Sequence, residues 1–270
     1  MIHGNHSPLV IKIGGASIED KATAPKVWNA LAQLHNSRTG GVVVVHGGGN
    51  AVDRHLDRLG FKTQRVEGIR ITPAEQVDEI AGVLAGRVNK AVVRELNSCG
   101  VRAVGLCLGD GNAFRTVRTR RYTFDAGRVG DVAAPVGNDG ELIKVLLANH
   151  YLPVLSSIGM DDQGFLNVNA DDAAAAVART LKAAALVLLT DVPGIYDSKK
   201  QIVRELTPLE VEVMIQSGQV TGGMIVKARA AATTASETGV PVLILSGSDG
   251  VALNDWVAGH AVGTRIVSGK

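Results

Sequence analysis

The sequence has few aromatic residues, few cysteines and no long apolar run. Only 3% of its 270 residues are Phe, Trp or Tyr, two are cysteines and eight are prolines, while 46% are hydrophobic. Two cysteines exclude a disulfide-stabilised miniprotein, and the hydrophobic fraction excludes a disordered chain. No apolar run approaches the roughly 18 residues that span a bilayer. We therefore expect a globular protein with a sizeable core and no membrane-spanning segment.

An excess of charge of one sign is also missing. Lys and Arg number 28 against 26 Asp and Glu, a formal charge of +2, which argues against a general nucleic-acid or membrane-surface binder. Small anionic ligands can still be held locally. Cys99 and Cys107 lack the spacing of zinc or redox motifs and are predicted to be core thiols. The first seven residues are polar and do not resemble a signal peptide, so we expect a cytoplasmic location.

Short apolar runs alternate along the chain with longer helical patterns. The runs are apolar throughout rather than alternating, as in a mostly parallel sheet that helices cover on both faces. This pattern predicts an α/β fold, a three-layer αβα sandwich. The expected strands are Leu9–Ile13, Val42–Val45, Val101–Leu108, Leu152–Ser156, Leu186–Thr190 and Val240–Leu245. β-Hairpin decorations are expected within 109–138 and at the turns 161–164 and 197–200.

The clearest helical pattern begins after Thr72. Thr72 and Glu75 have the spacing of a capping box, and Pro73 suits the first helical position. Apolar residues then recur at helical spacing as far as Leu96, and Gly100 supplies a stop. The pattern predicts one long helix from 72 to 98 with one buried face.

Glycine is abundant, with 32 residues, about 12% of the chain against roughly 7% in an average protein. Three glycine-bearing turns stand out. They are 12–15 (Lys-Ile-Gly-Gly), 46–49 (His-Gly-Gly-Gly) and 221–224 (Thr-Gly-Gly-Met). Without a Cβ the backbone can approach a ligand closely, and free N–H groups at a helix start form a nest for anions. A single double glycine is more often only a tight turn, and neither a P-loop nor a dinucleotide-binding motif is present.

Charged and polar residues accompany these turns. Lys12 ends a strand that otherwise needs only apolar residues, Lys227 lies one helical turn past Gly223, and Arg70 ends a short β run. A single such residue is usually a solvated surface charge, but a cation at the ligand-binding end of a strand is an exception. The planar fork of an arginine suits a carboxylate.

Two acidic segments complete the candidate site. Asn169 reads as a helix N-cap and one following aspartate suits the helix dipole, which leaves Asn167 and a second aspartate in 167–172 unexplained. A carboxylate there would orient nearby lysines. The stretch 191–196 follows a strand, where it either reverses the chain or forms the rim of a nucleotide pocket.

Taken together and in order, these motifs resemble the amino acid kinase superfamily and, within it, the acetylglutamate kinases of arginine biosynthesis. The resemblance runs nearly end to end. It rests on residues 12–15, 45–49, 68–72, 156–159, 167–171, 190–192 and 223–227. It implies transfer of the γ-phosphoryl group of ATP, carried with Mg²⁺, to the side-chain carboxylate of N-acetyl-L-glutamate.

The resemblance also implies residue roles. Lys12 and Lys227 would stabilise the transferring phosphoryl group from opposite lobes, and Asp171 would hold both lysines. Further members of the site follow from the family. Gly47 and Gly48 would donate backbone N–H groups to the acceptor, Arg70 and Asn167 would hold the substrate's other carboxylate, and Asp191, Val192, Gly194, Ile195, Tyr196, Gln219, Val220 and Thr221 would line the nucleotide site. No protein metal ligand is expected.

The family further implies an N-terminal lobe, 1–180, for amino-acid binding and dimerisation, and a C-terminal lobe, 181–270, for ATP, joined by one sheet. The helix from 72 to 98 would form the homodimer interface. Only seven polar residues precede the first strand, where arginine-inhibited relatives carry an extra helix, so we expect an arginine-insensitive dimer. Alternatives are a sister kinase for carrier-bound aminoadipate, aspartate or uridylate, and a non-catalytic ligand sensor on the same fold.

Overall fold

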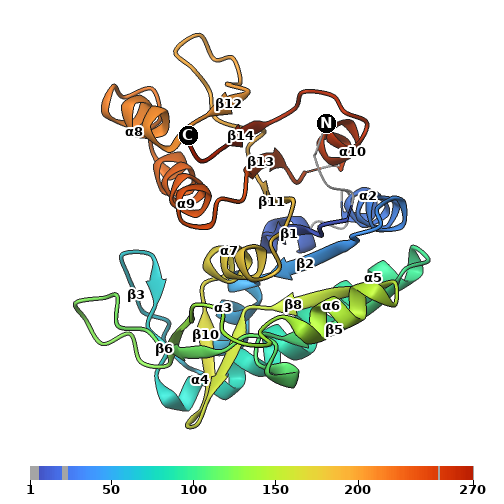
Figure 1. Cartoon of the computed structure of the whole chain (residues 1–270). Helices are drawn as coiled ribbons and strands as arrows, with labels where there is room; N and C mark the ends of the chain where they lie inside the picture. Colours follow the sequence, from blue (N-terminus) through green and yellow to red (C-terminus); the bar gives the residue numbers. More distant parts are fainter. Residues whose placement is uncertain (1–5, 20–23, 249, 270) are drawn as a thin grey trace.

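Eight strands form one central sheet in the computed structural model, which describes residues 6–19, 24–248 and 250–269 (Figure 1). Neighbouring strands are parallel except for the pair β13 and β14. The order across the sheet is β12 (Glu205–Leu206), β14 (Thr264–Ile266), β13 (Val242–Ser246), β11 (Ala185–Thr190), β1 (Leu9–Ile13), β2 (Val42–His46), β8 (Tyr151–Ser156) and β5 (Arg102–Cys107). The prediction of a mainly parallel sheet is therefore confirmed.

Helices cover both faces of this sheet. Val10 and Ile11 are both fully buried although their side chains point to opposite faces, which is why the strands are apolar throughout. Burying each such side chain stabilises the fold by roughly 1.5–3 kcal/mol. On one face lie α2 (Ala24–Ser37), α5 (Asn89–Ser98) and α10 (Val251–Val257); on the other lie α6 (Glu141–Ala148), α7 (Ala170–Thr180), α8 (Pro208–Gln216) and α9 (Gly223–Thr238). This is the predicted three-layer αβα sandwich.

The predicted hairpins form a second, smaller sheet and one separate turn. The second sheet has the order β6 (Thr116–Arg118), β7 (Val129–Val132), β10 (Gly164–Val168) and β9 (Ile158–Asp161). Its β9–β10 hairpin turns at residues 162–163, within the predicted turn. Tyr196 and Ile202 form an antiparallel bridge around the turn at 197–200. A further hairpin of β3 (Arg65–Val66) and β4 (Ile69–Arg70) was not anticipated as such.

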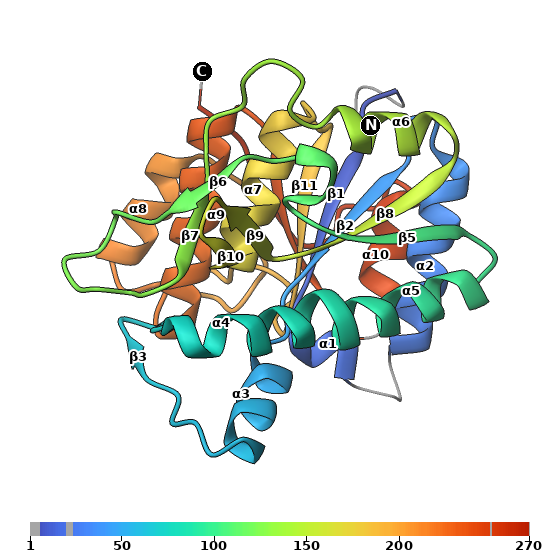
Figure 2. The same ribbon diagram turned by 90° about the horizontal axis from the view of Figure 1, so that it is seen from below.

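The long helix exists but differs from the prediction at its start and its middle. It runs as α4 (Ala74–Ala81), a π-helical segment η1 (Gly82–Val88) and α5, with α3 (Gly49–Arg58) packed against it (Figure 2). Gly100, with φ +83°, follows its end as expected.

The predicted capping box at Thr72 is wrong. Pro73 itself is the N-cap, and no side chain caps the helix. The Thr72 hydroxyl instead donates to the Arg70 carbonyl at 3.2 Å and accepts from Asn167 Nδ2 at 3.0 Å. Its backbone bridges to Gly127. Because these tertiary contacts engage the Thr72 side chain and backbone, the residue connects the helix entry to β10 instead of capping the helix.

The remaining features of the fold are the lack of a membrane-spanning helix among the described residues and the burial of the two cysteines. Among the residues that the structure describes, no helix is both long and apolar enough to cross a membrane. Cys107 is buried as predicted, and burial together with the neighbouring Asp110 raises its pKa to about 12, so the thiol stays protonated. Cys99 is only half-buried.

Candidate active site

The carboxyl ends of β1, β2 and β11 form the centre of the candidate site. These strands are parallel neighbours, with Ile13 opposite His46 on one side and Leu189 on the other. From β1 the chain continues to β2 on one side, and later returns to β11 on the other. Such a reversal of strand order marks the place where open α/β sheets bind ligands. The glycine turns after β1 and β2 and the acidic turn after β11 therefore meet at one edge.

The first ion pair of the site joins Lys12 to the start of α7. Lys12 Nζ lies 2.9 Å from Asp171 Oδ1, and the Lys12 side chain is only 15% exposed. Asn169 caps α7, because its side-chain oxygen accepts hydrogen bonds from the Asp171 and Asp172 amides. The predicted N-cap is confirmed, and it places Asp171 in the first helical turn beside the strand end. Strand and helix cap together hold this pair.

The second ion pair lies at the neighbouring strand end. Lys227, in the first turns of α9, contacts Asp191, which directly follows β11. The hydrogen bond from Lys227 lowers the pKa of Asp191. The prediction that Asp171 holds both lysines differs from this structure, in which each lysine has its own aspartate. Lys12 is part of β1, and Lys227 is paired to the residue that follows the adjacent strand β11.

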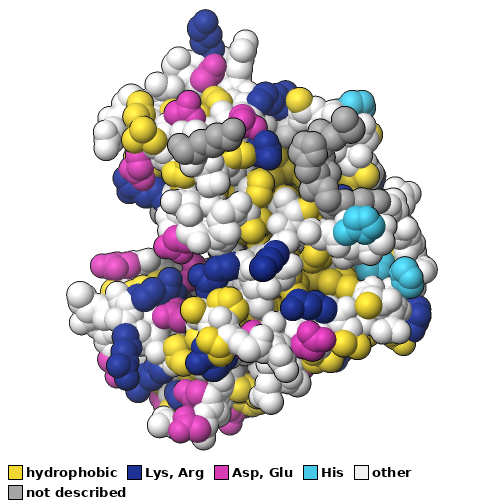
Figure 3. All heavy atoms as spheres, in the orientation of Figure 1, with side chains coloured by type: hydrophobic (Ala, Val, Ile, Leu, Met, Phe, Trp, Pro, Cys, Tyr) yellow, Lys and Arg dark blue, Asp and Glu magenta, His cyan; other side chains and the backbone are white. Residues whose placement is uncertain are grey.

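The surface is hollowed beside these strand ends. Figure 3 shows an indentation between the region of α8 and α9 and the region of β3, β6 and α7, with Lys and Arg side chains along its lower rim. An anionic ligand entering there would meet positive charge from both halves of the chain.

A cavity of about 160 Å³ brings together all four predicted amino-acid contacts. Gly47, Gly48, Arg70 and Asn167 line it. A Cβ on Gly47 would come within 3.2 Å of the Ala170 Cβ, so glycine allows the turn to pack closely against α7. The N-terminus of α3 follows at Gly49 and leaves backbone N–H groups without helical partners.

Arg70 is buried and already has partners in this cavity. Its Nη1 lies 2.5 Å from Asp53 Oδ1 and 3.2 Å from Thr63 Oγ1, and its Nη2 donates to the Gly49 carbonyl. Burial acts to raise the pKa of Asp53, but hydrogen bonds from Arg70 and Arg65 lower it below its ordinary value. Asp53 therefore stays ionised and fixes the Arg70 guanidinium, which retains further N–H donors.

His46 supports the glycine turn from behind, a role that the sequence pattern did not reveal. It is fully buried, its Nδ1 lies 2.8 Å from the Gly47 carbonyl, and its Nε2 lies 3.1 Å from Asn89 Nδ2. The carbonyl can only accept and the amide nitrogen can only donate, so Nδ1 carries the proton. Burial lowers the pKa of His46 to about 4, although the hydrogen bond to Gly47 opposes this. The imidazole is therefore neutral near pH 7.

Arg121 and Tyr122 also line the amino-acid cavity and were missed from the sequence. They belong to the loop between β6 and β7, which the sequence suggested only as decoration. Arg121 Nη2 lies 2.6 Å from both Asp172 Oδ2 and Asp131 Oδ1. The cluster of arginines at 118–121 was the available signal, but its distance along the chain from the glycine turns concealed the connection.

The predicted nucleotide residues lie in two segments near the second ion pair. The Thr190 hydroxyl and Val192 form a tight local turn, with the hydroxyl 2.8 Å from the Val192 carbonyl. Ile195 is fully buried, and its amide donates to Thr264 Oγ1 at 2.8 Å, whereas Tyr196 is 42% exposed. Val220 is also buried. The side chains of Ile195 and Val220 thus belong to the core, and only neighbouring backbone or exposed groups can face a ligand there.

Gly194 needs glycine for a steric reason. A Cβ at this position would lie 2.8 Å from both Ile202 Cγ2 and Thr264 Oγ1. Gln219 and Thr221 are exposed just before α9, which begins at Gly223 after a Gly222 N-cap with φ +59°. The two segments meet because Asp191 is paired to Lys227 on that helix.

Within 6–19, 24–248 and 250–269, no group of three or more His, Cys, Asp or Glu side chains is arranged to hold a metal ion.

The chain offers positive charge, amides and small polar groups around a gap at the strand ends. This set of groups can bind and orient two anions, and it can neutralise charge that moves between them.

Comparison with known proteins agrees with this geometry. The model of the amino acid kinase family matches residues 7–246. The chain is 42% identical over 260 residues to the acetylglutamate kinase of Colwellia psychrerythraea, covering 96% of each chain, and 40% identical over 262 residues to that of Proteus mirabilis, covering 97% of this chain and 99% of the relative. The crystal structure of smu.665 from Streptococcus mutans matches with a TM-score of 0.75 and 28% identity, covering 97% of this chain and 99% of that one. The chain belongs to the amino acid kinase family.

Proposed function

We propose that this protein is an acetylglutamate kinase, which transfers the γ-phosphoryl group of ATP to the side-chain carboxylate of N-acetyl-L-glutamate in arginine biosynthesis. The two acetylglutamate kinases are 42% and 40% identical to this chain over nearly its whole length. The observation that carries the proposal is the placement of the Lys12–Asp171 and Lys227–Asp191 pairs at adjacent strand ends. The cavity of Gly47, Gly48, Arg70 and Asn167 lies beside the first of these strand ends.

The reaction asks for charge neutralisation rather than a general base. A side-chain carboxylate with an ordinary pKa of about 4.3 is ionised at pH 7 and is already a nucleophile. The obstacle is repulsion between two anions. Two like charges about 4 Å apart repel by on the order of 4 kcal/mol at an effective dielectric constant of about 20, and a triphosphate facing a carboxylate brings several such pairs. Positioning and positive charge must lower this barrier.

We assign that task to the two lysines. Lys12, held by Asp171, would contact phosphoryl oxygens from the β1 side. Lys227 would contact them from the α9 side after exchanging Asp191 for phosphate oxygens, an exchange that its exposed position permits. Asp171 orients Lys12 and has no proton-transfer role in this scheme.

The amino-acid substrate would lie in the glycine-lined cavity. The backbone amides of Gly47 and Gly48 would donate to the reacting carboxylate, with the α3 N-terminus adding its favourable dipole. Arg70, fixed by Asp53, and Asn167, fixed by the Thr72 hydroxyl, would hold the other carboxylate. These contacts would select an amino-acid derivative with two carboxylates.

ATP would bind across Asp191, Val192, Gly194, Ile195 and Tyr196 and the segment 219–221. Mg²⁺ ordinarily takes most of its ligands from substrate phosphates and water, which suits a site without a protein carboxylate cluster among the described residues. It would neutralise phosphate charge while the lysines orient the transferring group.

We also propose two lobes, 1–180 for the amino acid and 181–270 for ATP, and a homodimer formed along the helix from Ala74 to Ser98. Multi-angle light scattering of the eluted protein tests the dimer. A monomer at micromolar concentration would contradict it.

A hydroxylamine-trapping assay tests the activity, because hydroxylamine converts an acyl phosphate to a coloured hydroxamate. The protein is assayed with ATP and Mg²⁺ against N-acetylglutamate, glutamate, aspartate and aminoadipate. We expect the product with N-acetylglutamate to exceed all others. Preference for another acid would indicate a sister kinase, and no hydroxamate with any acid would indicate a ligand sensor on the same fold.

A further inference from the structure

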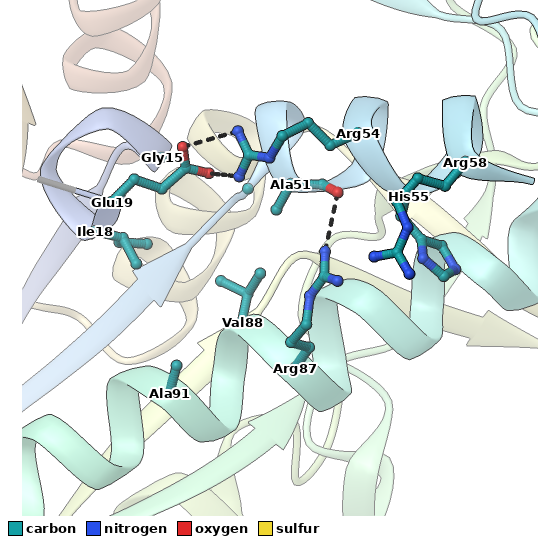
Figure 4. A pocket seen from close by; sticks show the side chains of 11 residues that line it. Gly15, Ile18, Glu19, Ala51, Arg54, His55, Arg58, Arg87, Val88 and Ala91 are labelled. Atoms are coloured by element: carbon teal, nitrogen blue, oxygen red, sulfur yellow. Dashed lines mark hydrogen bonds and ion pairs between the residues drawn. The ribbon is translucent and has the colours of Figure 1, made fainter.

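A second, larger cavity borders Gly15 and Gly48 and has no part in the proposed reaction, although its Arg87, Val88 and Ala91 belong to the helix that we propose as the homodimer interface. It has a volume of about 410 Å³ and lies between the short helix α1 (Gly15–Glu19), α3 and the η1–α5 helix (Figure 4). This volume is within the range of about 300–1,000 Å³ that small-molecule sites occupy. Gly15 and Gly48 form part of its wall. Gly48 also lines the amino-acid cavity, so a ligand in the second cavity would contact a turn that both cavities share.

The two sides of this cavity differ in chemistry. Figure 4 shows Arg58 of α3 and Arg87 of η1 extending towards each other, and Arg54 of α3 turned towards Glu19 of α1. Small apolar side chains form the opposite side and the floor. They belong to Ile18 of α1, Val88 of η1 and Ala91 of α5, whereas Ala51 lies on α3 beside the arginines. A mostly apolar pocket with a few convergent polar groups is typical of a binding site for an organic molecule.

The positive charge of this cavity is only partly balanced. Glu19 is the one carboxylate in the described wall, and it accepts two hydrogen bonds from Arg54, at 2.7 and 3.1 Å. Arg87 Nη2 donates one hydrogen bond to the Ala51 carbonyl at 3.2 Å. Within the described part of the chain, Arg58 has no carboxylate within 4 Å. His55, also in the wall, is paired with Glu79 at 2.8 Å.

Arg58 and Arg87 therefore hold unused N–H donors beside an apolar surface. A guanidinium carries five donors in a planar fork that matches carboxylate and phosphate oxygens. Burying apolar area adds roughly 25 cal/mol per Å². We propose that this cavity binds a small organic anion that carries a carboxylate or phosphate head group on a short apolar chain. The head group contacts Arg58 and Arg87, and the chain lies against Val88 and Ala91.

Hexyl phosphate and heptanoate serve as probes, with inorganic phosphate and hexanol as the charged and apolar halves. Binding to the full chain is measured by calorimetry in the presence of saturating ADP and N-acetylglutamate, so that the probes do not enter the active site. We expect one of the two amphiphilic anions to bind at least tenfold more tightly than inorganic phosphate or hexanol. Which of the two binds identifies the head group.

Two variants test the two sides of the cavity separately. Arg58→Gln with Arg87→Gln removes charge, and Ala91→Phe fills the apolar side. Each should weaken binding of the better probe at least tenfold, while Arg265→Gln, an exposed arginine on β14, should bind as the wild type does. Circular dichroism checks that each variant is folded, and a second filling variant, Ala91→Leu, replaces Ala91→Phe if that one is not.

Three results would overturn the proposal. They are absence of wild-type binding to both amphiphilic anions at millimolar concentration, equal binding of the better probe by the doubly substituted arginine variant, and inorganic phosphate or hexanol binding as tightly as the better probe. A change of sedimentation coefficient in the arginine variant without any probe binding would instead identify the cavity as an interface between copies.

A second inference, argued from other residues than the first, concerns the loop between β6 and β7. It rests on the proposed function. Arg121 donates from Nη2 to Asp172 Oδ2 at 2.6 Å and lies at the same distance from Asp131 Oδ1. Asp172 follows Asp171 in the first turn of α7. One guanidinium therefore ties the loop to the helix that orients Lys12, at a point where Arg121 and Tyr122 line the amino-acid cavity. We infer that Arg121 is a positioning residue that closes this loop over the amino acid.

The test separates binding from turnover. Arg121→Gln should raise KM for N-acetylglutamate about tenfold, with kcat and the KM for ATP changed less than about threefold, and Arg121→Lys should recover only part of the loss because it lacks the planar fork. Arg118→Gln is the matched control, since Arg118, the last residue of β6, pairs with Asp125 of the same loop and neither lines the cavity.

An active wild type with an unchanged KM in Arg121→Gln would overturn this inference, as would an equal effect of Arg118→Gln. A wild type that forms no hydroxamate from any acid would overturn the proposed function instead.

Discussion

The two lysine–aspartate pairs of the site have the same chemistry but different surroundings. Lys12 extends from a central strand and is 15% exposed, and its partner Asp171 belongs to a capped helix. Lys227 is 39% exposed, and its partner Asp191 is 72% exposed in a loop. The first pair is thus built into the fold, whereas water screens the second.

This difference separates preorganisation from exchange. A partly buried pair keeps its geometry before substrate arrives, which lets Lys12 act without reorganising at the moment of reaction. An exposed pair is worth only about 0–1 kcal/mol, so Lys227 can leave Asp191 for a phosphate at little cost. Lys12 would therefore be in place before substrate binds, and Lys227 would join the site when ATP is bound.

The largest effect is expected on removing the lysines. Lys227→Ala and Lys12→Ala should each lower kcat by roughly 10²–10³-fold, the typical loss for one group that stabilises transition-state charge. N-acetylglutamate affinity, measured by calorimetry, should change less than about threefold in Lys227→Ala, because its charge matters most during transfer. Lys144→Ala, on the exposed side of α6, is the control. An unchanged kcat in Lys227→Ala would reject the role.

Acid should destabilise the folded protein through His46, which supports the glycine turn at the end of β2. Folded His46 has a pKa of about 4 against 6.5 in the unfolded chain, so below pH 6.5 only the unfolded state takes up the proton. This contribution is fully present above pH 6.5 and is lost as the pH falls toward 4. Between pH 7.5 and 5 the loss should be about 2 kcal/mol.

Urea unfolding at the two pH values measures this loss, and His46→Gln, which cannot titrate, serves as the reference. The difference between wild type and variant isolates the histidine from other groups. If the wild type and His46→Gln lose the same stability, the buried imidazole does not carry the effect.

A smaller effect is expected at the amino-acid cavity. Arg70→Lys should raise KM for N-acetylglutamate about tenfold, because an ammonium cannot reach Asp53, Thr63 and the substrate together. The kcat should change little. Steady-state kinetics at saturating ATP measures both, and an unchanged KM would assign Arg70 a purely structural role through Asp53.

Of the two aspartates, Asp191 should give the smallest effect of all these substitutions. Asp171→Asn should lower kcat by about tenfold or more, since it removes a charge-assisted contact that orients Lys12. Asp191→Asn should change kcat by less than about fivefold, because an exposed pair contributes little. Equal losses in the two variants would remove the distinction between a fixed and an exchanging lysine.

Features that depend on local chemistry were predictable from the sequence. Apolar runs of strand length identified the sheet, and Asn169 identified the start of α7, because a side chain and an amide two residues away decide a cap. Thr72 shows where this reasoning fails. Its spacing to Glu75 fits a capping box, yet its hydroxyl bonds Asn167, 95 residues away. A tertiary partner took precedence over the local one.

Site residues divide in the same way. Gly47, Gly48, Arg70 and Asn167 could be proposed from motifs, and the structure places them around one cavity. His46 and Arg121 could not, since their importance depends on Asn89 and Asp172, which are distant in sequence. The partner of Lys227 was assigned to Asp171 for the same reason, whereas the fold places Asp191 against it.

The order of apolar runs and glycine turns determined, by itself, that this chain forms a parallel sheet with its cations at the strand ends. An apolar run of strand length or a glycine turn depends on only a few neighbouring residues, so it can be recognised along the chain. Only the tertiary structure decided which carboxylate holds each lysine, which loop lines the amino-acid cavity and where a second cavity remains. Those outcomes depend on how packed layers bring distant side chains within about 3 Å, a distance that hydrogen bonds require.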